Sequence, residues 1–244
     1  MTKQQWHTVF TKTHKWVGLV LGIQLLFWTL GGIVMTWIPI ETVRGTHKVS
    51  EAAPAPIRAA DDFLAVADIV SLSPKPVVEA RYSLLLGQPV VNLRHGDDTL
   101  SMRSATSGTL LSPIPAALAE RVAVADFNLD VPVLSVLEIN TPSVDYRGQL
   151  PVWQVRFDDA ENTALYVSQS DGRVVARRST IWRIFDFFWM LHIMDYSERT
   201  DINNWLIIAT SFFAALFTIS GFGLLFFRFY RRDFNFLLGR KTNS

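Results

Sequence analysis

Two long runs without a charged side chain constrain this chain more than any other feature of its sequence. The first extends from Trp16 to Ile40 and the second from Trp205 to Phe227, which makes 25 and 23 residues. About 20 apolar residues cross the hydrocarbon core of a bilayer as an α-helix, and tryptophan, which begins both runs, anchors at membrane interfaces. We therefore expect two transmembrane helices, over residues 16–40 and 205–227. A cleaved signal peptide is the alternative for the first run, but a signal peptide's apolar part spans only ~7–15 residues.

The basic residues at the two ends predict the orientation of these helices. Residues 1–15 carry a charge of +3 and residues 228–244 a charge of +4, so the net charge of +1 leaves −6 for residues 16–227. Cytoplasmic segments of membrane proteins carry the excess of lysine and arginine. We expect both ends in the cytoplasm of a bacterium, the spans in its inner membrane among lipids, and an acidic domain in the periplasm.

Residues 41–180 are numerous enough to form that domain. A linker is expected at EAAPAPIRAADD, followed by a short helix over Ala59–Ser71 and another over Ala116–Phe127. Runs typical of strands alternate with turn residues, and Asp171-Gly172 marks the clearest hairpin. The predicted strands are ARYSLLL, VVNLR, TLSMRSA, VWQVRF, ALYVS and RVVARR. The expected fold is an antiparallel α+β domain, which an aromatic interfacial helix and polar turn over residues 181–204 join to the second span.

The absence of cysteine and of familiar motifs narrows the chemistry. Without cysteine there is no disulfide scaffold, thiolate zinc site, iron–sulfur cluster or covalently attached haem. The sequence also lacks HExxH, GxSxG, P-loop and GxGxxG motifs, so protease, hydrolase, nucleotide-driven or flavin chemistry is unsupported. No nucleic-acid partner is expected. Any metal or haem must be held by histidine, carboxylate or methionine, and electrons must come from a separate, unidentified donor.

Two histidines stand at the predicted membrane boundaries. His14 precedes the first span at its cytoplasmic end, and His192 lies near the periplasmic end of the second. Ionisable residues at membrane depth are costly and usually functional, although a histidine that merely caps a helix is the alternative for both. Because the hydrocarbon core is roughly 30 Å thick, one protomer cannot place both on one iron, whereas in a two-fold dimer each histidine meets its own symmetry mate. Of the remaining histidines, His95 is interpreted as a solvated turn residue and His47 as an ordinary surface residue.

Other residues near the spans suit a haem or attract cations. Close approach of a porphyrin requires small residues, and the sequence offers a GxxxG pair and further glycines within the spans. The alternative for these glycines is plain helix packing, which GxxxG signals more often. Tryptophans near the second span would pack on haem or anchor at the interface, and nearby carboxylates would attract cations, although an ordinary solvated loop also explains them. These candidates are Gly22, Gly31, Gly221, Trp189, Trp205, Asp195, Glu198 and Asp201.

The order of several short motifs resembles a known family. These are HKWVGLVLG, TLGG, the YVSQSDGRVV hairpin, a histidine at position 192 and ISGFGLLFFRFYRR. Together they are similar to the PepSY-associated transmembrane family and to its ferric and ferrisiderophore reductases. The resemblance implies haem b held by His14 and His192, and electron transfer to periplasmic ferric iron or a ferric chelate in support of a ferrous iron transporter. Asp195, Glu198 and Asp201 would then draw the ferric iron. Larger relatives have four spans, so the two-span layout implies a homodimer with a four-helix membrane bundle.

A second class of function stays open at this stage. The chain would then be a non-catalytic, membrane-anchored accessory protein whose periplasmic domain binds a peptide, a metal or an iron transporter. That alternative predicts a colourless protein whose partner binding survives the loss of both histidines. A membrane sensor is disfavoured, because each predicted cytoplasmic end has only about 15 residues for signal output.

Overall fold

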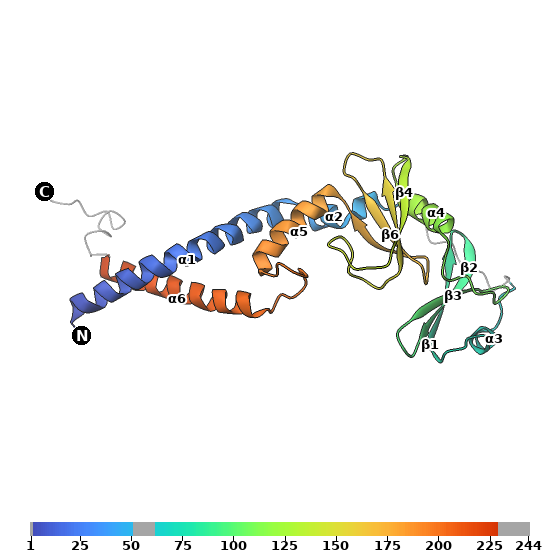
Figure 1. The fold of residues 1–244 in the computed structure, drawn as a ribbon, viewed down its shortest axis with the longest axis horizontal. Helices are drawn as coiled ribbons and strands as arrows, with labels where there is room; N and C mark the ends of the chain where they lie inside the picture. The colour runs from blue at the N-terminus through green and yellow to red at the C-terminus, as the bar shows by residue number, and fades with distance from the viewer. Residues whose placement is uncertain (1, 51–61, 229–244) are drawn as a thin grey trace, which may run out of the picture. The chain divides into compact units, whose positions relative to one another are not determined.

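The computed structural model describes residues 2–50 and 62–228 and divides into two compact units. The helical unit comprises residues 1–37 and 185–244, and the sheet unit comprises residues 38–184. Figure 1 shows both units, with helices at the two ends of the chain and strands in its middle. The expected linker EAAPAPIRAADD lies, except for its last residue, outside the described residues.

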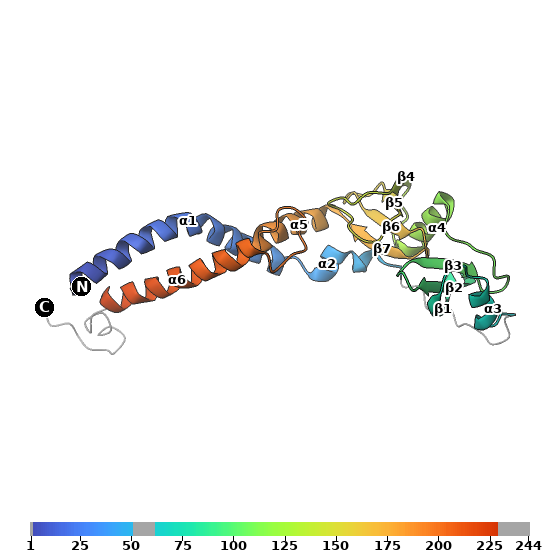
Figure 2. The same cartoon turned by 60° about the horizontal axis from the view of Figure 1, so that its bottom comes forward.

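Two long helices dominate the helical unit. They are α1 (Lys3–Trp37) and α6 (Trp205–Arg228), which run antiparallel and side by side (Figure 2). Both are long and apolar enough to cross a membrane. The first helix starts 13 residues before the charge-free run and stops before its end, because the ring of Pro39 disfavours helical backbone in the residue that precedes it. The aromatic segment predicted at the interface forms α5 (Thr180–Ile193).

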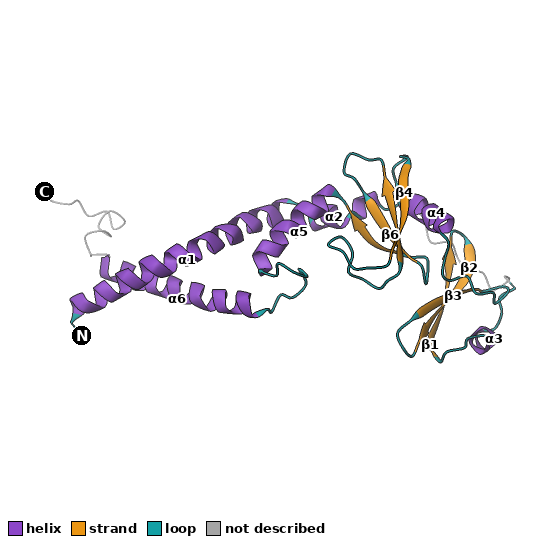
Figure 3. Ribbon diagram, viewed as in Figure 1, coloured by secondary structure: helices purple, strands orange, loops and turns teal. Residues whose placement is uncertain are grey.

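The sheet unit holds two antiparallel sheets, as Figure 3 shows. The three-stranded sheet consists of β1 (Val77–Leu85), β2 (Gln88–His95) and β3 (Leu100–Ser104). The four-stranded sheet consists of β4 (Val133–Ile139), β5 (Val152–Phe157), β6 (Ala164–Ser168) and β7 (Val174–Arg178). The helices are α2 (Ile40–Arg44), the 3₁₀ turn η1 (Thr46–Lys48), α3 (Val66–Ser71) and α4 (Ala116–Asp126). The predicted arrangement of two membrane helices around a sheet-containing α+β region is confirmed.

One apolar core joins the two sheets. Helix α4 lies on the four-stranded sheet, and its buried Ala119 and Val122 pack in one cluster with Val90 of β2 and Val155 of β5. The opposite face of β2 carries Val91 and Leu93, which form a second cluster with Ile69 of α3. Strand β2 is therefore buried on both faces, and this sandwiching makes the sheet unit a single packed body.

Two differences from the expected elements have physical causes. Strand β4 was not predicted, because it is an edge strand whose Leu134 and Leu137 are exposed and so break the expected alternation. Within the described residues the helix expected over Ala59–Ser71 begins only at Val66. The residues just before it are extended, and Leu64 donates its N–H to the carbonyl of Ala105 instead.

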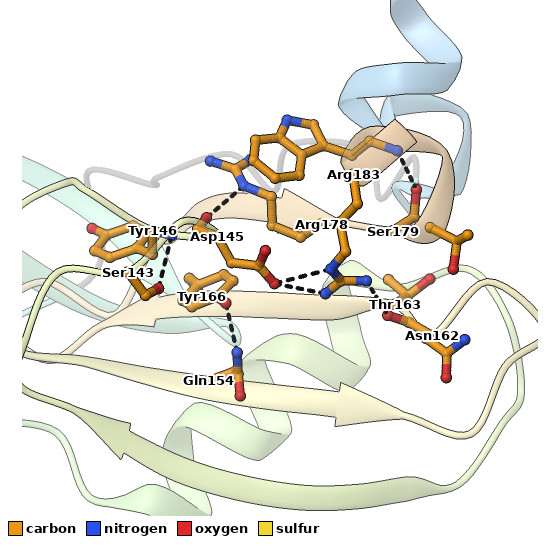
Figure 4. Close-up of polar contacts among 12 residues, drawn as sticks. Ser143, Asp145, Tyr146, Gln154, Asn162, Thr163, Tyr166, Arg178, Ser179 and Arg183 are labelled. Atoms are coloured by element: carbon orange, nitrogen blue, oxygen red, sulfur yellow. Dashed lines mark hydrogen bonds and ion pairs between the residues drawn. The ribbon is translucent and has the colours of Figure 1, made fainter. Parts of the chain in front are cut away.

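A polar cluster fixes the first turn of α5 to the four-stranded sheet (Figure 4). The guanidinium of Arg183 donates to the carboxylate of Asp145 at 2.7 and 3.1 Å, and the Ser179 hydroxyl caps the helix by accepting from Trp182 N–H. Arg178 donates to the carbonyl of Asp145 and stacks over the Trp182 ring at 4.1 Å. The beginning of α5 is thus held by charge-assisted bonds as well as by packing.

Candidate functional site

One stripe along α1 receives both of the other helices of the helical unit. Its members recur every three or four residues, so they occupy one face of the helix. We call this set the contact stripe: His14, Gly18, Leu21, Gln24, Trp28 and Gly31. Its first half faces α6 and its second half faces α5. Positions of the contact stripe recur seven residues apart, as they do in helix pairs whose side chains interlock.

His14 is held between α1 and α6. Its Nδ1 lies 2.8 Å from the Ser220 hydroxyl, and its ring stacks on Phe217 with 4.1 Å between centroids and an angle of 10°. Gly221 makes room for the ring, because a Cβ there would approach the Cε1 atom of His14 to 3.3 Å. The imidazole therefore has a defined orientation inside the helix pair.

The Ser220 hydroxyl lies between two hydrogen-bond partners, the Phe217 carbonyl at 2.7 Å and the His14 Nδ1 at 2.8 Å. When it donates its only hydrogen to the carbonyl, it accepts from the histidine. The His14 Nδ1 must carry the proton in this arrangement, and Nε2 keeps its lone pair. Within the described residues this Nε2 makes no hydrogen bond. A neutral imidazole with one nitrogen fixed by a donor bond is the form that binds metals.

His14 contacts α6 at a position inside the second charge-free run. Its partner Ser220 is seven residues from the end of the second charge-free run, which corresponds to about 10 Å of helix. The prediction that His14 sits at the mouth of the span stays a prediction, because the helix contacts alone do not give the position of the membrane surface. The neighbouring lysines, Lys12 and Lys15, carry long side chains that can reach toward the headgroups.

His192 belongs to the last turn of α5, which packs on the second half of the contact stripe. Trp28 donates its indole N–H to the His192 carbonyl at 2.8 Å, and the Gln24 amide donates to the Leu191 carbonyl at 3.1 Å. A Cβ on Gly31 would stand 3.9 Å from that of His192. The His192 Nδ1 is buried and has no partner among the described residues, a costly state for a polar atom.

The two histidines are well separated within one protomer. His14 and Trp28, which holds the backbone of His192, are 14 residues apart on the same face of α1, or about 20 Å along its axis. One metal ion cannot bind both rings at that distance. The expectation that a single protomer cannot offer two axial histidines to one iron is consistent with this spacing.

The remaining candidates near the spans fall into two groups. Gly31 and Gly221 face the two histidines, whereas Gly22 has no heavy atom within 4 Å of an added Cβ. The Trp189 indole donates to the Arg199 carbonyl at 3.2 Å, which ties it to the turn after α5. Trp205 is 76% exposed at the start of α6, as suits an interfacial anchor. Of these candidates, Gly31 and Gly221 contact the histidines, whereas Gly22, Trp189 and Trp205 do not in the described residues.

Asp195 organises the turn between α5 and α6. Its carboxylate accepts hydrogen bonds from the backbone N–H groups of four residues and from the Ser197 hydroxyl, and the side chain is buried. The amide of Asp201, helped by those of Thr200 and Glu198 and by Ser197, holds the pKa of Asp195 well below its usual range despite its burial. This structural task is at odds with the expectation that Asp195 draws iron, because both oxygens already have donors.

The other two carboxylates of the turn are exposed. Glu198 makes no ion pair with a described residue, and Asp201 accepts from the Asn203 amide at 2.9 Å. No group of three histidine, cysteine, aspartate or glutamate side chains gathers as a metal site within residues 2–50 and 62–228. The role of Glu198 and Asp201 toward ferric iron stays a prediction.

The interpretation of His95 as a solvated turn residue is wrong. His95 is the last residue of β2 and is only 4% exposed, and its Nε2 lies 2.8 Å from the Ser101 hydroxyl. Its side chain follows Val91 and Leu93 on the face of β2 that α3 covers, because alternate residues of a strand share a face. His47 is exposed, in agreement with the surface role expected for it.

Several residues that build the site were not singled out in the sequence. Gln24 and Trp28 are polar or amphipathic residues inside a span and lie on one face with Gly31, a spacing that marks a helix contact. Asp186 and Arg199 form a largely buried ion pair between α5 and the following turn. Each of these largely buried charges therefore has an opposite partner, which lowers the cost of burying it.

Comparison with known protein families gives a match over most of the chain. The family model described as the PepSY-associated TM region matches residues 11–244. No curated protein and no solved structure matches the chain significantly.

Proposed function

The chain belongs to the PepSY-associated TM family, and from this membership and the two oriented histidines we propose that it is a homodimeric, haem b-containing ferric reductase. Electrons from a cytoplasmic or membrane donor would cross the bacterial inner membrane and reduce ferric iron, free or chelated, on the periplasmic side. The ferrous product would supply a transporter. The observation that supports this most directly is the hydrogen bonding of His14, which leaves one ring nitrogen ready for a metal.

The residues of the helical unit fit a haem. His14 has the tautomer that an axial ligand needs when its Nδ1 donates to Ser220, because Nε2 is then unprotonated. His192 has a buried Nδ1 without a partner among the described residues, and such atoms are rare unless something binds them. Haem b would supply one-electron transfer between donor and iron. The chain itself would fix the two rings and exclude water from them.

Two copies of the chain are required by this proposal. About 20 Å of helix separates the two histidines of one protomer, so each must find its second axial partner elsewhere. A two-fold axis pairs each histidine with the same residue of a second copy. The dimer would then hold one haem between the His14 pair and one between the His192 pair.

The charge distribution supports the direction of electron flow. The two ends carry +7 and residues 16–227 carry −6, which favours cytoplasmic ends. The end of the α1–α6 helix pair that holds His14 would then face the donor, and the end near His192 would face the periplasm. The acidic domain would raise the local concentration of cations.

The spectrum of the purified full-length protein tests this proposal. We expect a Soret band and two haems per dimer by pyridine haemochrome assay. His14→Ala and His192→Ala should each remove one haem, and the double variant should remove both. The matched control is His47→Ala, which replaces an exposed histidine of the sheet unit and should leave haem content unchanged.

The outcomes separate this proposal from the accessory-protein alternative. A colourless protein after expression with ample haem, or a Soret band that persists in the double variant, would rule out the haem assignment. A haem protein that dithionite reduces but that ferric citrate does not reoxidise would keep the cofactor and reject the ferric substrate. A colourless protein that binds an iron transporter would favour the accessory role.

A further inference from the structure

The sheet unit contains a cavity that the proposed reductase does not use. Its volume is about 570 Å³, within the range of ~300–1,000 Å³ typical of sites for small ligands. One wall is the face of the β1–β2 ladder that carries Arg81, Ser83 and Asn92. The opposite wall is the turn between β6 and β7, with Asp171 and Arg173. All of these residues belong to the sheet unit, so the cavity is defined within one packed body.

In the described part of the chain, the side chains that line the cavity include one arginine without a carboxylate partner. Glu79 is paired with Arg94 at 3.1 Å, and Asp171 is paired with Arg173 at 2.5 Å, while Asp98, which does not line the cavity, lies 3.6 Å from Arg94. Arg81 also lines the cavity and has no ion pair or hydrogen bond among the described residues. Three arginines and two carboxylates give the lining a net charge of +1, in a part of the chain whose net charge is negative. The cavity is therefore a local site for an anion, and a guanidinium binds carboxylates in a bidentate fashion.

The polar groups beside Arg81 add a second requirement. Asn92 stands opposite Arg81 in the ladder and donates its amide to the Ser83 hydroxyl at 2.9 Å. Its carbonyl oxygen is buried without a donor, which leaves an acceptor that costs free energy until a donor reaches it. The Ser83 hydroxyl accepts from Asn92, so its own hydrogen is free for an anionic oxygen. A matching ligand carries a carboxylate for Arg81 and Ser83 and a hydroxyl donor for Asn92.

We propose that this cavity binds a small hydroxycarboxylate. Arg81 and Ser83 hold its carboxylate, and Asn92 accepts from its hydroxyl group. An amino acid also offers a hydrogen-bond donor, its ammonium group, but this positive charge would need a free carboxylate. Glu79 and Asp171 are already paired with arginines, so they favour a hydroxyl donor over an ammonium group. Binding does not require haem, so this inference stands or falls separately from the reductase function.

Isothermal titration of the full-length protein with metal-free citrate tests the proposal. We expect saturable binding that Arg81→Gln weakens at least about tenfold and that Asn92→Ala weakens to a lesser degree. Tricarballylate, which is citrate without its hydroxyl group, should bind about tenfold more weakly than citrate. The His14→Ala, His192→Ala double variant should bind citrate normally.

The controls keep the result tied to the cavity. Arg121→Gln removes an exposed arginine of α4 that does not line it and should leave citrate binding unchanged, and thermal unfolding should confirm that every variant folds. Equal binding of citrate to wild type and Arg81→Gln would overturn the proposal. Inorganic phosphate or alanine binding as tightly as citrate would overturn the assignment to hydroxycarboxylates.

Discussion

Ser220 controls the chemistry of His14 through a single hydrogen. Its hydroxyl lies 2.7 Å from the carbonyl of Phe217 and 2.8 Å from the imidazole Nδ1, and a haem ligand at Nε2 requires that it accept from the imidazole. Without that acceptor the proton can move to Nε2, and the ring can rotate. We therefore expect Ser220 to decide whether the Nε2 atom of His14 has a lone pair available for a metal.

We expect Ser220→Ala to lower haem affinity about 10- to 100-fold, as the loss of a partner of a metal-binding histidine usually does. Haem titration of the apoprotein, followed by the Soret band, measures this effect. Ser220→Thr keeps the hydroxyl and should restore most of the affinity. Thr218→Ala is the matched control, because that exposed hydroxyl bonds only to the carbonyl of Ala214 in its own helix. Equal affinity in Ser220→Ala and wild type would show that the tautomer is not set by Ser220.

The packing of α1 against α6 depends on a small residue in the contact stripe. A Cβ on Gly18 would lie 2.7 Å from the Phe217 ring, and that ring cannot retreat freely because it stacks on His14. We expect Gly18→Ala to lower the free energy of unfolding by about 1–2 kcal/mol, since overpacking outweighs the better helix propensity of alanine. Thermal unfolding in detergent measures the change. Gly22→Ala, where an added Cβ meets nothing within 4 Å, should be neutral or slightly stabilising.

The turn between α5 and α6 should respond to acid through Asp195. Hydrogen bonds hold its pKa below the usual value of about 3.9, so its stabilising contribution is complete above that value and is lost as the pH falls through the lower, folded-state pKa. We expect Asp195→Ala to lower the thermal midpoint by several degrees at pH 7. The difference between variant and wild type should stay constant from about pH 8 to pH 5 and shrink below about pH 4. A difference that grows with acidity would contradict this assignment.

The elements with a strong periodic or compositional pattern were predictable, and those decided by tertiary contacts were not. Both long helices, α4 and the β6–β7 hairpin follow from charge-free runs and turn residues. The docking of α5 on α1 does not, because the ion pair of Asp186 with Arg199 makes its charges tolerable only once the turn has folded. His14 and His192 were recognisable from their positions. Their hydrogen-bond partners were not, because those contacts join residues more than 160 positions apart.

At the scale of the whole molecule, the proposed dimer makes a quantitative prediction. Each single histidine variant should retain one haem per dimer, and its size by light scattering should remain that of two protomers, because the other histidine pair is intact. A monomer carrying a full haem would contradict the symmetric arrangement. Midpoint potentials of the two single variants should also differ, since His14 has a hydroxyl partner and the buried Nδ1 of His192 has none in the described residues.

Because positions of the contact stripe recur seven residues apart, the contacts of α1 with α5 and α6 depend on the number of residues between Gly18 and Trp28. One inserted alanine rotates everything after it by about 100° around the helix axis, so the α6-facing and α5-facing halves would no longer share a face. Seven inserted residues restore the face but lengthen the separation by about 10 Å. A one-residue insertion should therefore disrupt one helix contact, whereas a full heptad should preserve both contacts and lengthen the path between them. Helix α1 therefore sets both the distance between its two helix contacts and their relative rotation about the helix axis. Insertions of different length would change these two quantities separately.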